Sequence, residues 1–200
     1  MVRIRIKKLF QDLKEQDVYI CAWVRTNRAQ AQFGFLNVND GSTLQTLQVV
    51  YDNTLSNFDS ISKFRVGVSV SIKGRVVLTP NMKQPFEVHA SEIVMLGDCP
   101  ESYPIQPKRH TREFLRDNAH LRPRTNLFNA VFRIRSVAAM AIHSYFQSNG
   151  YLYVHTPLIT TADCEGSDQM FKLTTFDLNN IPMKDGKADM SKDLFGRTAF

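Results

Sequence analysis

The feature that most constrains the fold is a series of strand-like segments that fills the first half of the chain. Each segment is rich in the β-branched and aromatic residues that strands favour. The segments are Val18–Arg25, Phe33–Val38, Thr46–Tyr51, Val68–Leu78 and Phe86–Leu96. Asp40-Gly41 predicts a tight turn after the second segment, because glycine reaches a positive φ without steric cost. We therefore expect an all-β domain that ends near residue 96.

One helical segment interrupts the strands in the third gap. Apolar residues recur there at every third position, which predicts a short helix within Thr54–Phe64. Three strands, a short helix and two strands are the element order of the OB-fold, a small five-stranded barrel that commonly binds nucleic acid. Pattern alone also fits another small barrel, of the SH3-like or Greek-key kind.

The second half of the chain has a different pattern. Pro100, Pro104 and Pro107 stiffen residues 97–110, which we interpret as an interdomain linker. Helices are then predicted over Thr111–Asp117 and Asn126–Asn149, the second ended by a glycine. Tyr151–Thr160 is predicted to be a strand, and the remainder is loop-like. The chain is thus expected to be α+β, with a barrel domain at 1–96 and the start of a second, incomplete domain at 111–200.

Composition excludes several classes of protein. Hydrophobic residues make up 43% and charged residues 22%, which is ordinary for a chain with a core and excludes wholesale disorder. No apolar run is long enough for a membrane helix, so no membrane partner is expected. The basic N-terminus lacks the apolar centre of a secretory signal, although a short organellar presequence remains an alternative. The three cysteines are odd in number and far apart, which favours free thiols and a cytoplasmic location.

Charge is the strongest positive signal in the second half. Residues 108–135 contain eight Lys or Arg and two Asp or Glu, a balance equal to the +6 of the whole chain. Arginines at this density suit phosphate or carboxylate partners, and a solvated or intersubunit surface explains them equally well. The glycines form no phosphate-binding or dinucleotide motif, and the histidines and cysteines lack metal-ligand spacing, so no metal site is predicted.

Aromatic residues are the corresponding signal in the barrel. Arg25, Asn27 and Arg28 follow the first strand, and Phe33 and Phe35 alternate along the second. Exposed aromatic rings can stack unpaired bases, at about 1–3 kcal/mol per base, while arginines hold phosphates. The same alternation also fits two rings in the core, and the pattern alone favours the core.

Longer matches identify a family. The segments Ala22-Trp23-Val24-Arg25, Phe35–Gly41 and Leu47-Gln48-Val49-Val50 resemble the anticodon-binding domain of the class IIb aminoacyl-tRNA synthetases. The second half is similar to the asparaginyl-tRNA synthetases of the bacterial type. The matching segments there are Tyr103-Pro104, Lys108-Arg109-His110, His120–Asn126, Asn149–Tyr151, Thr156–Thr160, Asp163–Gly166, Met170-Phe171, Asp177-Leu178 and Lys192–Gly196.

The resemblance implies an anticodon site in the barrel. Phe35 matches the residue that stacks on the middle anticodon base, and Gln48 the one that hydrogen-bonds the edge of that base. Arg28 matches a basic contact beside it. For Phe35 this replaces the core interpretation, whereas Phe33 remains undecided.

The resemblance also implies that the second half of the chain is the start of the catalytic domain. The long helix with Tyr151–Pro157 corresponds to class II motif 1, in which Pro157 packs at a homodimer interface. Glu165 matches the residue that receives the α-amino group of the amino acid, in a loop that closes over the substrate. A carboxylate suits that role, because an ammonium group removed from water needs a paired anion. The flanking Ser167-Asp168-Gln169 departs from the usual Ala-Gly-Glu of the family.

The implied activity is the ATP-dependent activation of asparagine, with Mg²⁺, and its transfer to tRNA(Asn) by a homodimer. The family's Ser-Gly-Gln segment and its motif 2 and motif 3 arginines match positions beyond Phe200. We therefore expect these 200 residues alone to bind the anticodon and to catalyse neither step. The alternatives are an aspartyl-tRNA synthetase and a truncated, non-catalytic tRNA-binding protein.

Overall fold

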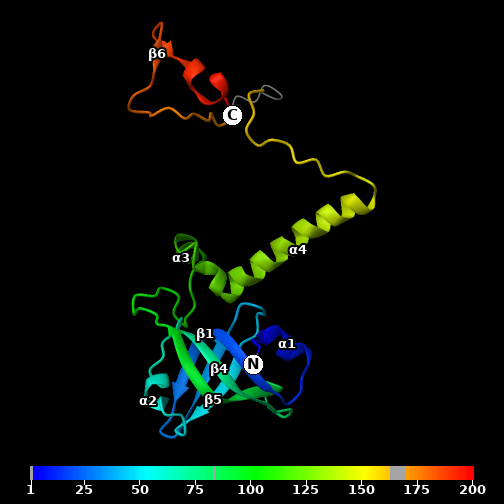
Figure 1. The fold of residues 1–200 in the computed structure, drawn as a ribbon, viewed down its shortest axis with the longest axis vertical. Coiled ribbons are helices and arrows are strands. Elements are labelled where there is room, and N and C mark those ends of the chain that lie inside the picture. The colour runs from blue at the N-terminus through cyan, green and yellow to red at the C-terminus, as the bar shows by residue number, and fades with distance from the viewer. Residues whose placement is uncertain (1, 83, 163–169) are drawn as a thin grey trace. The chain divides into compact units, whose positions relative to one another are not determined.

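A computed structural model describes residues 2–82, 84–162 and 170–200 (Figure 1). The chain forms two compact units, Met1–Met140 and Ala141–Phe200, which are described separately below.

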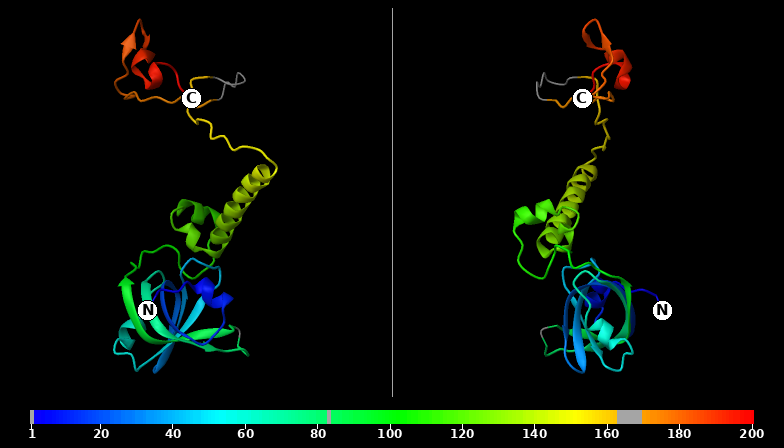
Figure 2. Two further views of the ribbon diagram at one scale, coloured as in Figure 1. Left: turned by 45° about the vertical axis from the view of Figure 1, so that its right-hand side comes forward. Right: turned by 90° about the vertical axis from the view of Figure 1, so that its left-hand side faces the viewer.

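The first unit contains a closed barrel of five strands (Figures 1 and 2). The strands are β1 (Asp17–Ala29), β2 (Phe33–Asn39), β3 (Leu47–Asp52), β4 (Ser69–Leu78) and β5 (Phe86–Gly97). Their order around the barrel is β1-β2-β3-β5-β4, with β3 and β5 parallel and the other pairs antiparallel. The short α2 (Phe58–Ile61) lies between β3 and β4 in the chain. The predicted OB-fold barrel is confirmed, and the helix in its third gap is shorter than expected.

Alternation along the strands builds the core. Val18, Ile20 and Val24 of β1 are buried, and so are Leu36 of β2 and Val49 of β3. Because successive side chains of a strand point to opposite faces, the intervening residues form the outer surface of the barrel. A bulge between Val24 and Thr26 shifts this alternation in the second half of β1.

A helix that the pattern did not predict completes the core. In α1 (Ile6–Gln11), the side chains of Ile6 and Leu9 are 0% and 2% exposed and belong to the barrel core. The Ile6 N–H donates to Asp40 Oδ2 at 2.9 Å, so the turn predicted at Asp40-Gly41 also holds the first turn of α1. Gly41 has a positive φ of +78°, as expected from the Asp40-Gly41 turn signal in the sequence.

Helical structure follows the barrel, as predicted. The elements are α3 (Arg112–Asp117), the 3-10 helix η1 (Arg122–Arg124) and α4 (Asn126–Ser148). Thr111 caps α3, since its hydroxyl oxygen accepts a hydrogen bond from the Phe114 N–H at 3.2 Å. Gly150, at φ +85°, follows the end of α4 and confirms the predicted stop.

The predicted strand at Tyr151–Thr160 is wrong. These residues form no strand, and the side chains of Leu152 and Leu158 are each 90% exposed. Thr160 pairs with Phe200 through two backbone hydrogen bonds, of 3.0 and 2.8 Å. A strand needs a neighbour along its length, and among the described residues of this unit only the end of the segment has one.

Residues 170–200 of the second unit form only short elements joined by turns and loops. Strands β6 (Met183–Lys184) and β7 (Lys187–Ala188) form a small hairpin, followed by the 3-10 helices η2 (Met190–Lys192) and η3 (Leu194–Gly196). The buried Asp193 carboxylate accepts hydrogen bonds from the Thr175 and Leu194 N–H groups at 2.7 and 2.8 Å. No helix in the described ranges is long and apolar enough to cross a membrane.

Candidate nucleic-acid interface

Both phenylalanines of β2 lie on the outside of the barrel. Phe33 is 37% exposed and Phe35 is half-buried, whereas Gly34 and Leu36 between and after them face inward. The core position predicted from the pattern is therefore wrong for both rings. The reason lies at Gly34, where a Cβ atom would come within 2.3 Å of Tyr51 Cζ. Tyr51 fills the core beneath β2, so the inward position of the Phe-Gly-Phe segment must be glycine.

A first row of side chains crosses the outer face around Phe35. The strand register pairs Arg28 with Phe35, Phe35 with Val50, and Val50 with His89. The Arg28 guanidinium carbon lies 5.9 Å from the centre of the Phe35 ring. The Phe33 ring meets that of Phe35 edge to face, with ring centres 5.4 Å apart. The row thus combines an accessible aromatic ring with a cation.

A second, polar row runs beside the first. The register pairs Thr26 with Asn37 and Asn37 with Gln48. Gln48 Nε2 donates to Glu87 Oε2 at 2.9 Å, and the other Glu87 oxygen contacts His89 Nε2 at 2.9 Å. Because an ionised carboxylate only accepts hydrogen bonds, Glu87 fixes the Gln48 amide with its nitrogen toward β5. The carbonyl oxygen is then the group with which the Gln48 side chain can accept a further hydrogen bond.

The polar row and two residues of the first row, Arg28 and Phe35, line one groove of about 870 Å³. Arg28, Phe35 and Gln48, the three residues matched by sequence to anticodon contacts, all line it. Further lining residues are Trp23, Arg25, Gln84, Glu87, Tyr103 and Arg124. Glu87 was not singled out from the sequence, because its relation to Gln48 depends on the parallel register of β3 and β5.

Arginines form another wall of the groove. The Arg124 guanidinium carbon lies 4.9 Å from the centre of the Trp23 ring, and the Arg25 guanidinium donates to the Arg124 carbonyl oxygen. Burial is the main cause that lowers the pKa of Arg25, and the nearby Arg124 charge lowers it further. The basic segment 108–135 thus contributes Arg124 to the groove. Its Arg122 instead stacks on Phe128, with the guanidinium carbon 4.8 Å from the ring centre.

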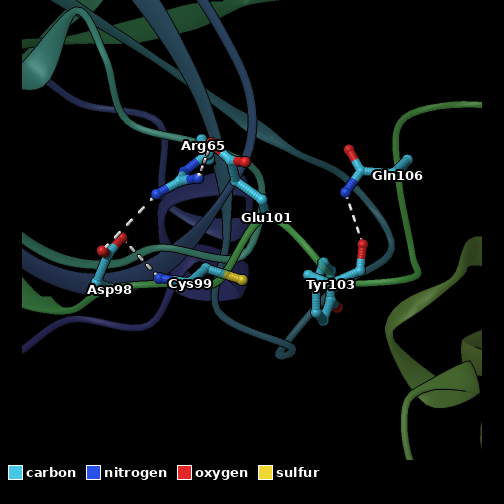
Figure 3. A network of polar contacts seen from close by, with 6 residues as sticks. All are labelled: Arg65, Asp98, Cys99, Glu101, Tyr103 and Gln106. Atoms are coloured by element: carbon cyan, nitrogen blue, oxygen red, sulfur yellow. Dashed lines mark hydrogen bonds and ion pairs between the residues drawn. The ribbon is translucent and has the colours of Figure 1, made fainter.

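The predicted linker packs onto the barrel beside this groove (Figure 3). Arg65 forms an ion pair with Glu101 at 2.8 Å and a longer one with Asp98 at 4.0 Å. Cys99 is buried against Gly67, and Gln106 Nε2 donates to the Tyr103 carbonyl oxygen at 2.6 Å. The first part of the linker is therefore anchored, and it extends the groove through Tyr103 and Gln106.

Other residues noted in the sequence lie elsewhere. Asn27 faces inward and hydrogen-bonds to the Tyr51 hydroxyl, so it is not a surface contact. Pro157 is exposed in the second unit. Glu165 lies outside the described residues. In the part of the chain that the structure describes, no group of three or more His, Cys, Asp or Glu side chains could hold a metal ion.

Two family models match the chain. One describes an OB-fold nucleic acid binding domain and matches residues 18–96. The other describes tRNA synthetases class II (D, K and N) and matches residues 111–183.

Known proteins match along most of the chain. The asparagine–tRNA ligase of Clostridium tetani is 49% identical over 100% of this chain and 44% of its own length. The asparagine–tRNA ligase of Acholeplasma laidlawii is 54% identical over 92% of this chain and 40% of its own length. The crystal structure of asparaginyl-tRNA synthetase from Pyrococcus horikoshii complexed with asparaginyl-adenylate matches with a TM-score of 0.77. It is 25% identical, over 88% of this chain and 41% of that one. The chain thus spans less than half the length of these relatives.

Proposed function

We propose that this chain belongs to the class II tRNA synthetases of the D, K and N family and binds the anticodon of tRNA(Asn) as part of an asparagine–tRNA ligase. The observation that carries the proposal is the groove in which Arg28, Phe35 and Gln48 meet on the outer face of the barrel. We assign residues 1–96 to anticodon binding, 97–110 to the linker and 111–200 to the start of the catalytic domain.

The side chains of the groove suit an unpaired base. In this proposal the Phe35 ring stacks on the middle anticodon base, which is worth about 1–3 kcal/mol. Arg28 on β1 neutralises the adjoining phosphate, and Gln48 on β3 accepts a hydrogen bond at the edge of the base. The phosphate backbone then lies toward β1 and the base edge toward β3 and β5.

The orientation of Gln48 favours a particular base. Asparagine codons have adenine in the middle, so the middle anticodon base is uridine. Uridine carries an imino N–H between two carbonyl groups, and the Gln48 carbonyl oxygen can accept from that N–H. Glu87 supports this by holding the amide nitrogen of Gln48. In cytosine the equivalent nitrogen is an acceptor and would face the same oxygen without a proton between them.

The remaining roles concern the complete enzyme. We propose that it activates asparagine with ATP and Mg²⁺, then transfers it to tRNA(Asn). Glu165 is proposed to bind the α-amino group of asparagine, and Pro157 to lie in a homodimer interface. A cytoplasmic location is consistent with Cys21 and Cys99, which are free thiols.

Replacement of Phe35 tests the anticodon site. Phe35→Ala should weaken binding of the tRNA(Asn) anticodon stem-loop by about 5- to 150-fold, the equivalent of one lost base stack. Binding is measured by fluorescence anisotropy, and far-UV circular dichroism should be nearly unchanged because the ring lies outside the core.

Val94→Ala is the matched control, since Val94 is an exposed apolar residue of β5 outside the groove. It should bind the stem-loop like the unmodified chain. Equal affinity of Phe35→Ala and the unmodified chain would contradict the proposed site. Loss of the fold in Phe35→Ala would point to a structural role for the ring.

A further inference from the structure

We infer that Phe33 is a second stacking platform, which takes the base next to the one on Phe35. This inference rests on the proposed function and extends it from one nucleotide to two. The ligand is a neighbouring nucleobase of the same single-stranded loop.

The position of the Phe33 ring supports this assignment. Phe33 is two residues from Phe35 on β2, so both rings leave the same face of the strand. The ring is more exposed than that of Phe35, and its centre is only 5.4 Å away. The Gln30 N–H donates to the Phe33 carbonyl oxygen at 2.8 Å, so the backbone of Phe33 is held at the end of the β1–β2 hairpin. A ring on a fixed backbone loses little freedom when a base stacks on it.

The angle between the two rings determines how a second base would bind. The ring planes are 89° apart, so two bases that each stack on one ring cannot stack on one another. Single-stranded loops are read with their bases unstacked and splayed apart, which matches this geometry. The pair therefore fits two successive nucleotides of an opened loop and does not fit a continuous stack.

Charges around the rings favour a base over a phosphate at Phe33. The residue opposite Phe33 on β3 is Asp52, an exposed carboxylate whose pKa is lowered mainly by its hydrogen bond with the Thr54 side chain. It repels phosphate from that side. Arg28 lies on the β1 side and attracts the phosphates there. The backbone of the bound RNA then follows β1, and its bases cover the two rings of β2.

The test removes rings and bases in combination. Stem-loop affinities are measured for the unmodified chain and for Phe33→Ala, Phe33→Tyr, Phe35→Ala and Val94→Ala. The RNAs are the tRNA(Asn) anticodon stem-loop and versions lacking the first, middle or third anticodon base. Thermal unfolding of each variant verifies that the barrel remains folded.

Phe33→Ala should weaken binding of the intact loop about fivefold or more, while Phe33→Tyr and Val94→Ala stay within twofold. The loss should disappear when one of the two flanking bases is absent, and persist when the middle base is absent.

Two results would overturn the inference without affecting the proposed function. One is a loss in Phe35→Ala with no loss in Phe33→Ala. The other is a loss in Phe33→Ala that disappears only without the middle base, because Phe33 would then merely hold the Phe35 ring. Unchanged affinity in both alanine variants would instead contradict the anticodon site itself, and the inference with it.

Discussion

The bulge between Val24 and Thr26 determines that Asn27 faces the core and Arg28 the outer surface of the barrel. In the sequence Asn27 lies next to Arg28, yet the two side chains leave opposite faces of β1. Its Nδ2 donates to the carbonyl oxygens of Ile61 and Ser62 at 2.8 and 3.1 Å, and its Oδ1 accepts from the Tyr51 hydroxyl at 2.9 Å. Asn27 thereby connects the end of α2 to β1 and gives the buried Tyr51 hydroxyl a hydrogen-bond acceptor.

Asn27→Ala should lower the free energy of unfolding by about 1–3 kcal/mol, because it leaves the buried Tyr51 hydroxyl and the Ser62 carbonyl group without the partner that Asn27 supplies. Urea unfolding followed by circular dichroism measures this. Tyr51→Phe is the comparison, since it removes the hydroxyl together with its need for a partner and should cost less. If the two variants lost the same stability, the contacts of Asn27 with α2 would be unimportant.

Some residues of the candidate site were identified from the sequence resemblance, and others only from the geometry of the barrel. Phe35 and Gln48 were matched from the sequence because each lies in a short ordered motif, and Arg28 follows the motif Ala22–Arg25 by three residues. Glu87 was missed because its role depends on which strand lies beside β3. Phe33 could not be placed by alternation, since the pattern gives shared faces and does not say which face is buried.

Among the elements, α1 is the one whose place in the core is least expected. It has only six residues and begins in a basic segment, so its two buried positions produce a weak periodic signal. The five strands were predictable because alternation persists along each of them. The strand predicted at Tyr151–Thr160 is wrong for a different reason. Its residues favour extended structure, but a strand also needs a pairing partner, which local sequence does not reveal.

Leu9→Ala should therefore lower the free energy of unfolding by about 2–5 kcal/mol, the usual cost of truncating a buried leucine. Lys8→Ala, at the exposed neighbouring position, should change it by no more than about 0.5 kcal/mol. Urea unfolding of both variants makes the comparison. Similar values for the two would mean that α1 is dispensable for the barrel.

For the whole molecule, the lengths of the relatives show how much of a ligase this chain corresponds to. The chain spans 44% and 40% of the length of the two ligases compared above. We propose that the chain carries the surface that recognises the anticodon, and that amino-acid activation requires the rest of a longer enzyme.

An enzyme that includes this chain should catalyse ATP–pyrophosphate exchange with asparagine and not with aspartate. Residues 1–200 alone should bind the stem-loop and give no exchange. A pyrophosphate exchange assay with each amino acid measures both. Exchange that depends on aspartate would assign the enzyme to the aspartyl branch, and exchange by the 200 residues alone would contradict the division of roles proposed here.

The strand order of the barrel also has a consequence for how the chain folds during synthesis. β1 completes its pairing only with β4, and β3 only with β5, so closure joins residues as far apart as Asp17 and Arg75. Such distant contacts slow folding, because a long loop must close before they form. On the ribosome, the free edge of β1 stays unpaired until β4 has left the exit tunnel, and that of β3 until β5 has left it. Until then the nascent chain is exposed to aggregation, and the groove that we propose binds the anticodon does not yet exist.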